Sequence, residues 1–135
     1  MNFIHAHRND AKDIADELHV STEDILGLSG HETYWGTNRA STQLGNYFSQ
    51  EPGGKLKTYD GDRYRKSGQD FEDSMGYSSV FGKSDPEDFA KNLTGPHNFN
   101  PGIKTKKVNG DPNFVPKVVG AIASVKNRIN CPGAQ

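Results

Sequence analysis

The chain of 135 residues has a single cysteine, Cys131, and no long hydrophobic run. One cysteine excludes a disulfide within the chain, and its place near the C-terminal end argues against a catalytic thiol, because chain ends are seldom held in place. Residues 1–10 lack the apolar stretch of a signal peptide, and no segment approaches the ~20 apolar residues of a membrane helix. We therefore expect no membrane insertion.

The chain also lacks an excess of charge of either sign. Sixteen Lys and Arg residues against 17 Asp and Glu give a net charge of −1, which provides no overall attraction to nucleic acid. Only 32% of residues are hydrophobic and the mean hydropathy is −0.83, but an aromatic content of 10% argues against disorder. We expect one domain over residues 1–135, a monomer rich in loops, which is either complete or excised from a longer protein.

Metal and cofactor motifs are missing as well. No Cys/His set has the spacing of a zinc site. His5 and His7 alternate like metal ligands, but a His-x-His at a chain end is more often polar surface. Residues 53–55, Gly-Gly-Lys, lack the other positions of a phosphate-binding loop. We expect no metal and no cofactor.

Apolar residues recur with helical spacing in four segments, residues 10–20, 21–35, 85–93 and 115–129. Between them, residues 36–84 have few aliphatic side chains. There Asp60-Gly61 separates two alternating segments, residues 55–59 and 62–66, which is typical of a two-residue β-hairpin. The sequence predicts an α+β domain, mainly helical, with a small β-hairpin insert.

Helix boundaries have local signals. Asp85 and Pro86 suit the start of the third helix, and Gly95-Pro96 its end. A capping cluster at residues 111–113 precedes the last helix, so Pro116 must lie in the first turn of that helix.

Glu32 is the most informative residue. It follows Ile25, Leu28 and Ser29 at positions i, i+3, i+4 and i+7, so a helix would direct its carboxylate along the apolar face. The helix pattern breaks at Trp35-Gly36, which places Glu32 near a helix C-terminus.

A carboxyl group drawn toward a core loses hydration, and this favours its protonated form. A carboxylic acid that is protonated near neutral pH is what a glycosidase needs to protonate a departing sugar oxygen. The alternative is a surface glutamate on the last turn of an ordinary helix.

Several motifs in one order resemble glycoside hydrolase family 73, the flagellar- and autolysin-type peptidoglycan glucosaminidases with a lysozyme-like fold. Residues 32–36, Glu-Thr-Tyr-Trp-Gly, and 46–48, Asn-Tyr-Phe, are similar to that family's Glu-Ser/Thr-x-Trp-Gly and Asn-Leu-Phe signature. Residues 77–79 and 87–93 resemble its Tyr-x-Ser stretch and the following helix, and 111–118 its Asp-Pro-x-Tyr block. The resemblance implies a lysozyme-like fold with Glu32 as the catalytic acid.

Two positions depart from the family pattern. Thr58 stands where the family often has a second acidic residue, and Phe114 stands where it has a tyrosine. Asp60 and Asp62 are the acids nearest the expected place; Asp60 is explained by the turn itself, so Asp62 is the better catalytic candidate. Three further candidates are Glu51, Asp70 and Glu72. A single glutamate is the other reading, since lysozyme-like enzymes such as goose-type lysozymes and lytic transglycosylases use one.

Aromatic side chains around these motifs suit a glycan, because sugar rings present apolar CH faces. Core packing would explain some of them. The predicted substrate-binding residues are Trp35, Asn46, Tyr47, Phe48, Tyr59, Tyr64 and Phe114.

These observations predict a peptidoglycan hydrolase that cleaves β-1,4 bonds between MurNAc and GlcNAc, as a muramidase or as an N-acetylglucosaminidase. The alternatives are a lytic transglycosylase and a non-catalytic glycan-binding domain. We expect action on the bacterial cell wall after delivery by a secretion system, by phage lysis or within a larger parent protein. Peptidoglycan strands are the expected partner, together with an immunity protein if the chain is a toxin.

Overall fold

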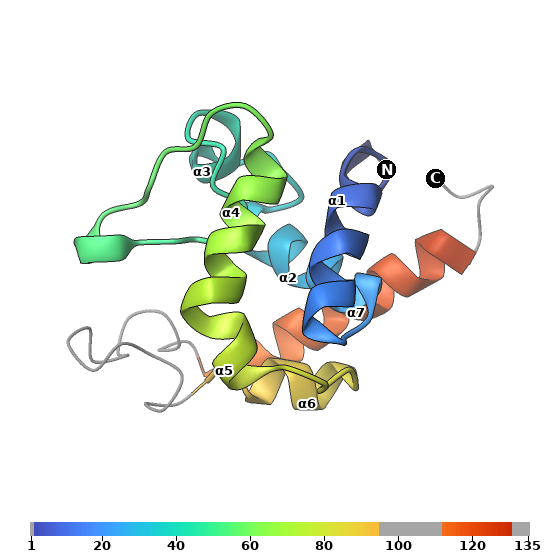
Figure 1. Ribbon diagram of the computed structural model, residues 1–135. Coiled ribbons are helices and arrows are strands. Elements are labelled where there is room, and N and C mark those ends of the chain that lie inside the picture. The colour runs from blue at the N-terminus through green and yellow to red at the C-terminus, as the bar shows by residue number, and fades with distance from the viewer. Residues whose placement is uncertain (1, 95–111, 131–135) are drawn as a thin grey trace.

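The computed structural model describes residues 2–94 and 112–130, which form an assembly of helices (Figure 1). The α-helices are α1 (Asn2–Leu18), α2 (Thr22–Thr33), α3 (Arg39–Thr42), α4 (Arg63–Phe71), α5 (Tyr77–Ser79), α6 (Pro86–Lys91) and α7 (Phe114–Asn130). A 3₁₀ turn at Pro52–Gly54 precedes α4, and a π-helical turn at Glu72–Gly76 joins α4 to α5. No helix within the described ranges is long and apolar enough to cross a membrane.

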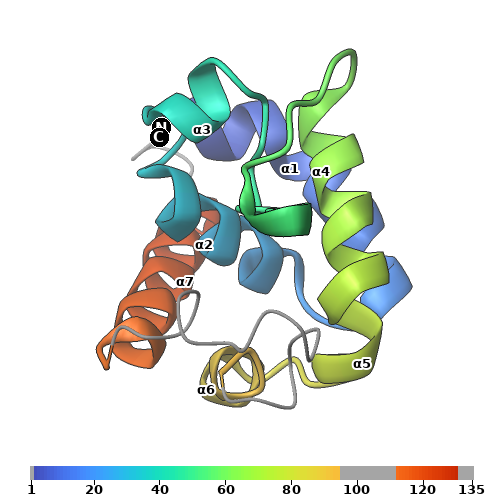
Figure 2. The same cartoon turned by 90° about the vertical axis from the view of Figure 1, so that its left-hand side faces the viewer.

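Helix α2 is the centre of the fold. It packs between α1 and α7, and every residue from Asp24 to Gly30 is buried (Figure 2). Gly27 makes this packing feasible, because a Cβ atom there would lie 2.5 Å from the side chain of Ile122 on α7. The close approach of α2 and α7 fixes the axis of the helix whose last turn contains Glu32.

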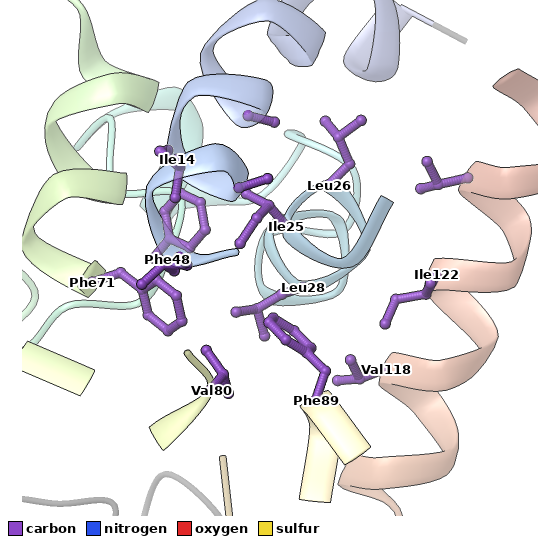
Figure 3. Packing of buried hydrophobic residues seen from close by; sticks show 14 of the residues in the cluster. Ile14, Ile25, Leu26, Leu28, Phe48, Phe71, Val80, Phe89, Val118 and Ile122 are labelled. Atoms are coloured by element: carbon purple, nitrogen blue, oxygen red, sulfur yellow. The ribbon is translucent and has the colours of Figure 1, made fainter. Parts of the chain in front are cut away.

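The hydrophobic core surrounds α2 on several sides. In Figure 3, Ile25 and Leu28 of α2 lie among side chains from α1, α4, α6 and α7. Each large apolar side chain buried in this way contributes ~1.5–3 kcal/mol relative to an exposed one. The core residues labelled in the figure are Ile14, Ile25, Leu26, Leu28, Phe48, Phe71, Val80, Phe89, Val118 and Ile122.

A capping box forms the start of α2. Ser21 caps the helix: its hydroxyl accepts a hydrogen bond from the backbone N–H of Asp24 at 3.1 Å, and the Asp24 carboxylate accepts one from the Ser21 N–H at 3.4 Å. This reciprocal pair satisfies two backbone donors that the first turn leaves free.

The outer helices agree with prediction in type but not in every boundary. Asp85 caps α6 by accepting from the N–H of Asp88 at 3.2 Å, and Pro116 lies in the first turn of α7. Helix α1 begins at Asn2, well before the predicted residue 10, because Phe3 and Ile4 extend its buried stripe. Asp111 and the Gly95-Pro96 pair lie outside the described residues.

The predicted β-hairpin is wrong. No strand forms anywhere in residues 2–94 or 112–130. The turn at Asp60-Gly61 exists, with Gly61 at φ 81°, but the expected return strand at 62–66 is the first part of α4. A segment of five residues is too short to distinguish the two-residue period of a strand from the 3.6-residue period of a helix. The buried residues Tyr64, Ser67 and Phe71, at i, i+3 and i+7, show the helical period.

Candidate active site

Glu32 lies on the last turn of α2 and is half-buried. The helix stops abruptly after it, since Tyr34, Trp35 and Gly36 all have positive φ angles of 50°, 58° and 79°. The N–H of Trp35 donates to the carbonyl of Gly30 at 2.8 Å. A left-handed residue with such a bond is a common helix stop, but three in succession turn the chain sharply away from the carboxylate.

Side chains hold this helix end in place. The Thr33 hydroxyl donates to the carbonyl of Ser29 at 2.7 Å and accepts from the N–H of Gly36 at 2.9 Å. The Asn38 amide donates to the carbonyl of Glu32 at 3.1 Å. Carbonyl groups that the helix end leaves free are thereby satisfied, so the backbone under Glu32 has a defined position.

Among the residues that the structure describes, Ser49 is the hydrogen-bond partner of the Glu32 carboxylate. The Ser49 hydroxyl donates to Glu32 Oε1 at 2.5 Å, a length typical of a hydroxyl bound to a carboxylate. No described residue forms a hydrogen bond with Oε2. Sequence reasoning missed Ser49, although it directly follows the Asn-Tyr-Phe motif.

Asn46 organises the loop that contains Ser49. Its side-chain amide donates to the carbonyls of Gln50 and Lys57 at 2.9 and 3.0 Å, and its oxygen accepts from the N–H of Gln50 at 2.9 Å. Asn46 is fully buried, with these backbone groups as its partners. Asn46 therefore shapes the loop beside Glu32, and its contact with substrate stays a prediction.

Most of the predicted glycan-binding aromatics are core residues. The side chains that are only 2–6% exposed are those of Phe48, Tyr59, Tyr64 and Phe114. Packing and internal hydrogen bonds give these side chains a structural role in this structure, and their contact with a glycan stays a prediction. Tyr64, for example, shares a 2.7 Å hydrogen bond with the buried Ser29 hydroxyl, which joins α4 to α2.

Trp35 and Tyr47 differ from that set because they are half-buried and partly open to solvent. The Trp35 ring packs over Gly30, where a Cβ atom would overlap it, and meets the edge of Phe3 at a centroid distance of 5.6 Å. Tyr47 lies against His7 at 4.8 Å. These two aromatics remain the predicted sugar contacts.

A cavity of about 350 Å³ lies behind Glu32, between the end of α2 and α7. His31 is half-buried there, with its ring 5.8 Å from that of Phe114. The lining residues are Gly30, His31, Tyr34, Trp35, Lys117, Gly120, Ala121 and Ser124. Glu32 is not among these lining residues.

Neither predicted second acid interacts with Glu32. Asp62 caps α4 by accepting from the N–H of Arg65 at 3.3 Å, and it lies next to Asp10 of α1. Burial, with a further contribution from the negative charge of Asp62, raises the pKa of Asp10. The Asp60 side chain is exposed. The structure thus gives Asp62 a capping role.

The other acidic candidates also have surroundings of their own. Asp70 accepts from Lys57 at 2.8 Å and from the Tyr59 hydroxyl at 2.6 Å. Burial alone would raise its pKa, but these hydrogen bonds hold it below the usual value. Asp70 lines a second cavity of about 450 Å³ with Lys57, Thr58, Tyr59, Asp60, Lys66 and Gln69. Glu51 is exposed, and Glu72 is fully buried in the π-helical turn.

Within the described part of the chain, no three His, Cys, Asp or Glu side chains form a group that could hold a metal ion. His5 and His7 are both on α1. His7 is stacked on Tyr64 at a centroid distance of 4.5 Å, and burial lowers its pKa, opposed by the negative charge of Asp62. The imidazole therefore acts as a packing group in this structure.

Comparison with known proteins gave matches among solved structures. No protein-family model and no curated protein sequence matches the chain. A chain in the structure of a type VI secretion system effector–immunity complex from Pseudomonas protegens is 30% identical, with a TM-score of 0.76 over 96% of this chain and 93% of that one.

Two more distant structures share the fold. The peptidoglycan hydrolase from Sphingomonas sp. A1 is 21% identical, with a TM-score of 0.73 over 95% of this chain and 92% of that one. The catalytic domain of the autolysin Auto from Listeria monocytogenes is 13% identical, with a TM-score of 0.65 over 93% and 83%. The helical fold around α2, the ordered motifs that begin at Glu32, and the near full-length match to the Pseudomonas protegens chain agree with one another. The chain therefore belongs to the same family as the Pseudomonas protegens chain and shares the lysozyme-like fold of these cell-wall enzymes.

Proposed function

We propose that this protein cleaves β-1,4 glycosidic bonds in the glycan strands of peptidoglycan, with Glu32 as the general acid. The observation that supports this most is the placement of Glu32. It lies at a rigid helix end, with Oε1 bound to Ser49 and Oε2 without a partner among the described residues. An acid held at one oxygen and free at the other is suited to deliver a proton to a bound substrate.

The reaction follows from this geometry. Glu32 gives the proton on Oε2 to the bridging oxygen, the bond from that oxygen to the sugar C1 breaks, and positive charge develops on the sugar ring. A water molecule then adds to C1, and its proton returns to the Glu32 carboxylate. Proton transfer of this kind contributes typically ~10²–10⁴-fold to the rate.

We assign the stabilisation of the sugar cation to the carbonyl oxygen of the substrate's own N-acetyl group. Support comes from the acids near the expected second position, since Asp62 caps α4 and Asp70 is bound to Lys57 and Tyr59. The resemblance to family 73 favours cleavage of the GlcNAc–MurNAc bond, which is glucosaminidase activity. The alternative is cleavage of the MurNAc–GlcNAc bond by a muramidase, because Thr58 and Phe114 depart from the family pattern.

Replacement of Glu32 by Gln tests the proposal. The amide keeps the size and the contact with Ser49 but has no acidic proton, so glycan cleavage should fall by at least ~10²-fold with little change in melting temperature. Mass spectrometry of the muropeptides released from purified cell walls reports the activity. It also identifies the sugar at each new reducing end and any anhydro product of a lytic transglycosylase.

The outcomes separate the two classes of function. A Glu32→Gln protein that still releases muropeptides at the wild-type rate would reject Glu32 as the acid. Wild-type protein that sediments with cell walls but releases nothing would indicate a glycan-binding domain without catalysis.

The place of action and the partner follow the same proposal. The Pseudomonas protegens structure is an effector–immunity complex, which supports delivery of this chain to the cell wall of a target bacterium as a secreted effector. Its protein partner would then be an immunity protein that covers the surface around Glu32 and Ser49.

A further inference from the structure

Position 49 has an unusual backbone conformation for its residue type. Ser49 has a φ of 53°, in the left-handed region that residues with a Cβ atom rarely adopt. Glycine would take this conformation without strain. A strained residue persists only where its surroundings enforce it, and such residues cluster at functional sites. The strained side chain here is the one that contacts Glu32.

The loop around Ser49 is fixed from three directions. Asn46 holds the backbone of Gln50 from inside the loop. The N–H of Tyr47 donates to the Ser67 hydroxyl of α4 at 3.1 Å. The hydroxyl of Ser74, in the π-helical turn after α4, donates to the Gln50 side chain at 2.9 Å. The Ser49 hydroxyl therefore has a defined place relative to α2, although 17 residues separate Ser49 from Glu32.

The Ser49 hydroxyl is also the polar group that determines the orientation of the Glu32 carboxyl. No ion pair to Glu32 forms within the described ranges, so neither a lysine nor an arginine competes for the carboxylate. A neutral hydroxyl orients the group without adding a positive charge that would strongly favour the deprotonated acid.

We propose that Ser49 is a positioning residue for catalysis. Its hydroxyl holds Oε1 of Glu32, which fixes the carboxyl rotamer and leaves the catalytic proton on Oε2, directed away from the loop. This inference rests on the proposed role of Glu32 as general acid. It explains why a strained serine occupies a position where glycine would be easier to accommodate.

Loss of the hydroxyl has two expected effects. The carboxyl group becomes free to rotate, so kcat should fall by ~10–100-fold, part of the full contribution of an acid catalyst, while KM changes little. A hydrogen bond from a hydroxyl favours the charged form of a carboxylate, and the variants lack that bond. The alkaline limit of activity should therefore move upward by roughly one pH unit or less.

Ser49→Ala and Ser49→Gly form a matched pair for this test. Both lack the hydroxyl, but the glycine variant also removes the strain at φ 53°, so it should melt at or above the wild-type temperature. Both variants should show the same fall in kcat and the same shift of the alkaline limit. Ser78→Ala is the control, because the Ser78 hydroxyl is exposed and donates to the carbonyl of Met75 at 3.1 Å. It should behave like wild type.

Steady-state kinetics with soluble glycan strands from pH 4 to 9, together with thermal melts, give the readout. A folded Ser49→Gly protein with wild-type kcat and an unchanged alkaline limit would overturn the role of Ser49. If Glu32→Gln is inactive in that case, the proposed function stands without the positioning role of Ser49. If Glu32→Gln is active, the proposed function itself fails.

Discussion

At the scale of single residues, the two aspartates of the predicted hairpin differ in what their carboxylates contact. Asp62 accepts from the first turn of α4, whereas Asp60 is exposed beside Gly61, which has the positive φ that its turn requires. Both roles can be filled by asparagine, which caps helices about as well as aspartate and forms the same turn before glycine.

Asp60→Asn and Asp62→Asn should therefore each keep cell-wall cleavage within about twofold of wild type, because cap and turn survive. Asp62→Ala, which removes the cap, should lower the free energy of unfolding by ~1 kcal/mol. Muropeptide release and urea unfolding measure these effects. A loss of ~10²-fold or more in the Asp62→Asn protein, with an unchanged melting temperature, would instead identify a second catalytic carboxylate.

At the scale of elements, the contact between α2 and α7 sets the position of the helix end with Glu32. A Cβ atom on Gly27 would lie 2.5 Å from the Ile122 side chain and 2.8 Å from its backbone, so α7 would have to move. Overpacking of this kind costs ~1–3 kcal/mol. Gly120 on α7 differs, because a Cβ atom on it would meet no other atom within 4 Å.

We expect Gly27→Ala to lower the free energy of unfolding by ~1–3 kcal/mol, measured by urea denaturation. Gly120→Ala is the matched control on the partner helix. A Cβ atom there meets nothing within 4 Å, so the substitution should raise stability by up to ~1 kcal/mol through helix propensity. Equal effects of the two substitutions would contradict the close packing at Gly27.

At the scale of the whole molecule, two buried acids couple stability to pH. Burial, with a further contribution from the negative charge of Glu17, raises the pKa of Glu72 to about 8. Burial, partly offset by the Ser21 hydrogen bonds, raises the pKa of Asp24 to about 7. Because the folded state holds these protons more tightly than the unfolded chain, both groups stabilise the fold below the pKa of the unfolded state and lose that contribution as pH rises.

The melting temperature should consequently fall between about pH 5 and pH 8. In Glu72→Gln the side chain is neutral at every pH, so this decline should be smaller and the variant should be more stable than wild type at pH 8. Glu51→Gln is the control, since Glu51 is exposed. A wild-type melting temperature that rises over this interval, or a Glu72→Gln protein with the same decline, would contradict the prediction.

The sequence by itself determined four of the helices, α1, α2, α6 and α7, and the place of the acid. The capping pair of Ser21 and Asp24, the cap at Asp85 and the apolar stripe of α7 are local signals, set by backbone hydrogen bonds and by the helical period. They suffice to put Glu32 on a last helical turn. The ordered motifs that begin there identified the lysozyme-like family before any contact was known.

Only the tertiary structure decided what surrounds Glu32. The segment after Asp60-Gly61 is a helix because this lets Tyr64 and Phe71 bury their side chains in the core. That stabilisation depends on distant residues, so the alternating pattern of five residues could not predict it. Four of the aromatics expected to hold sugar, Phe48, Tyr59, Tyr64 and Phe114, are buried for the same reason. Ser49 reaches Glu32 across 17 residues of chain, through a loop fixed by Asn46 and α4, and no local propensity encodes such a contact.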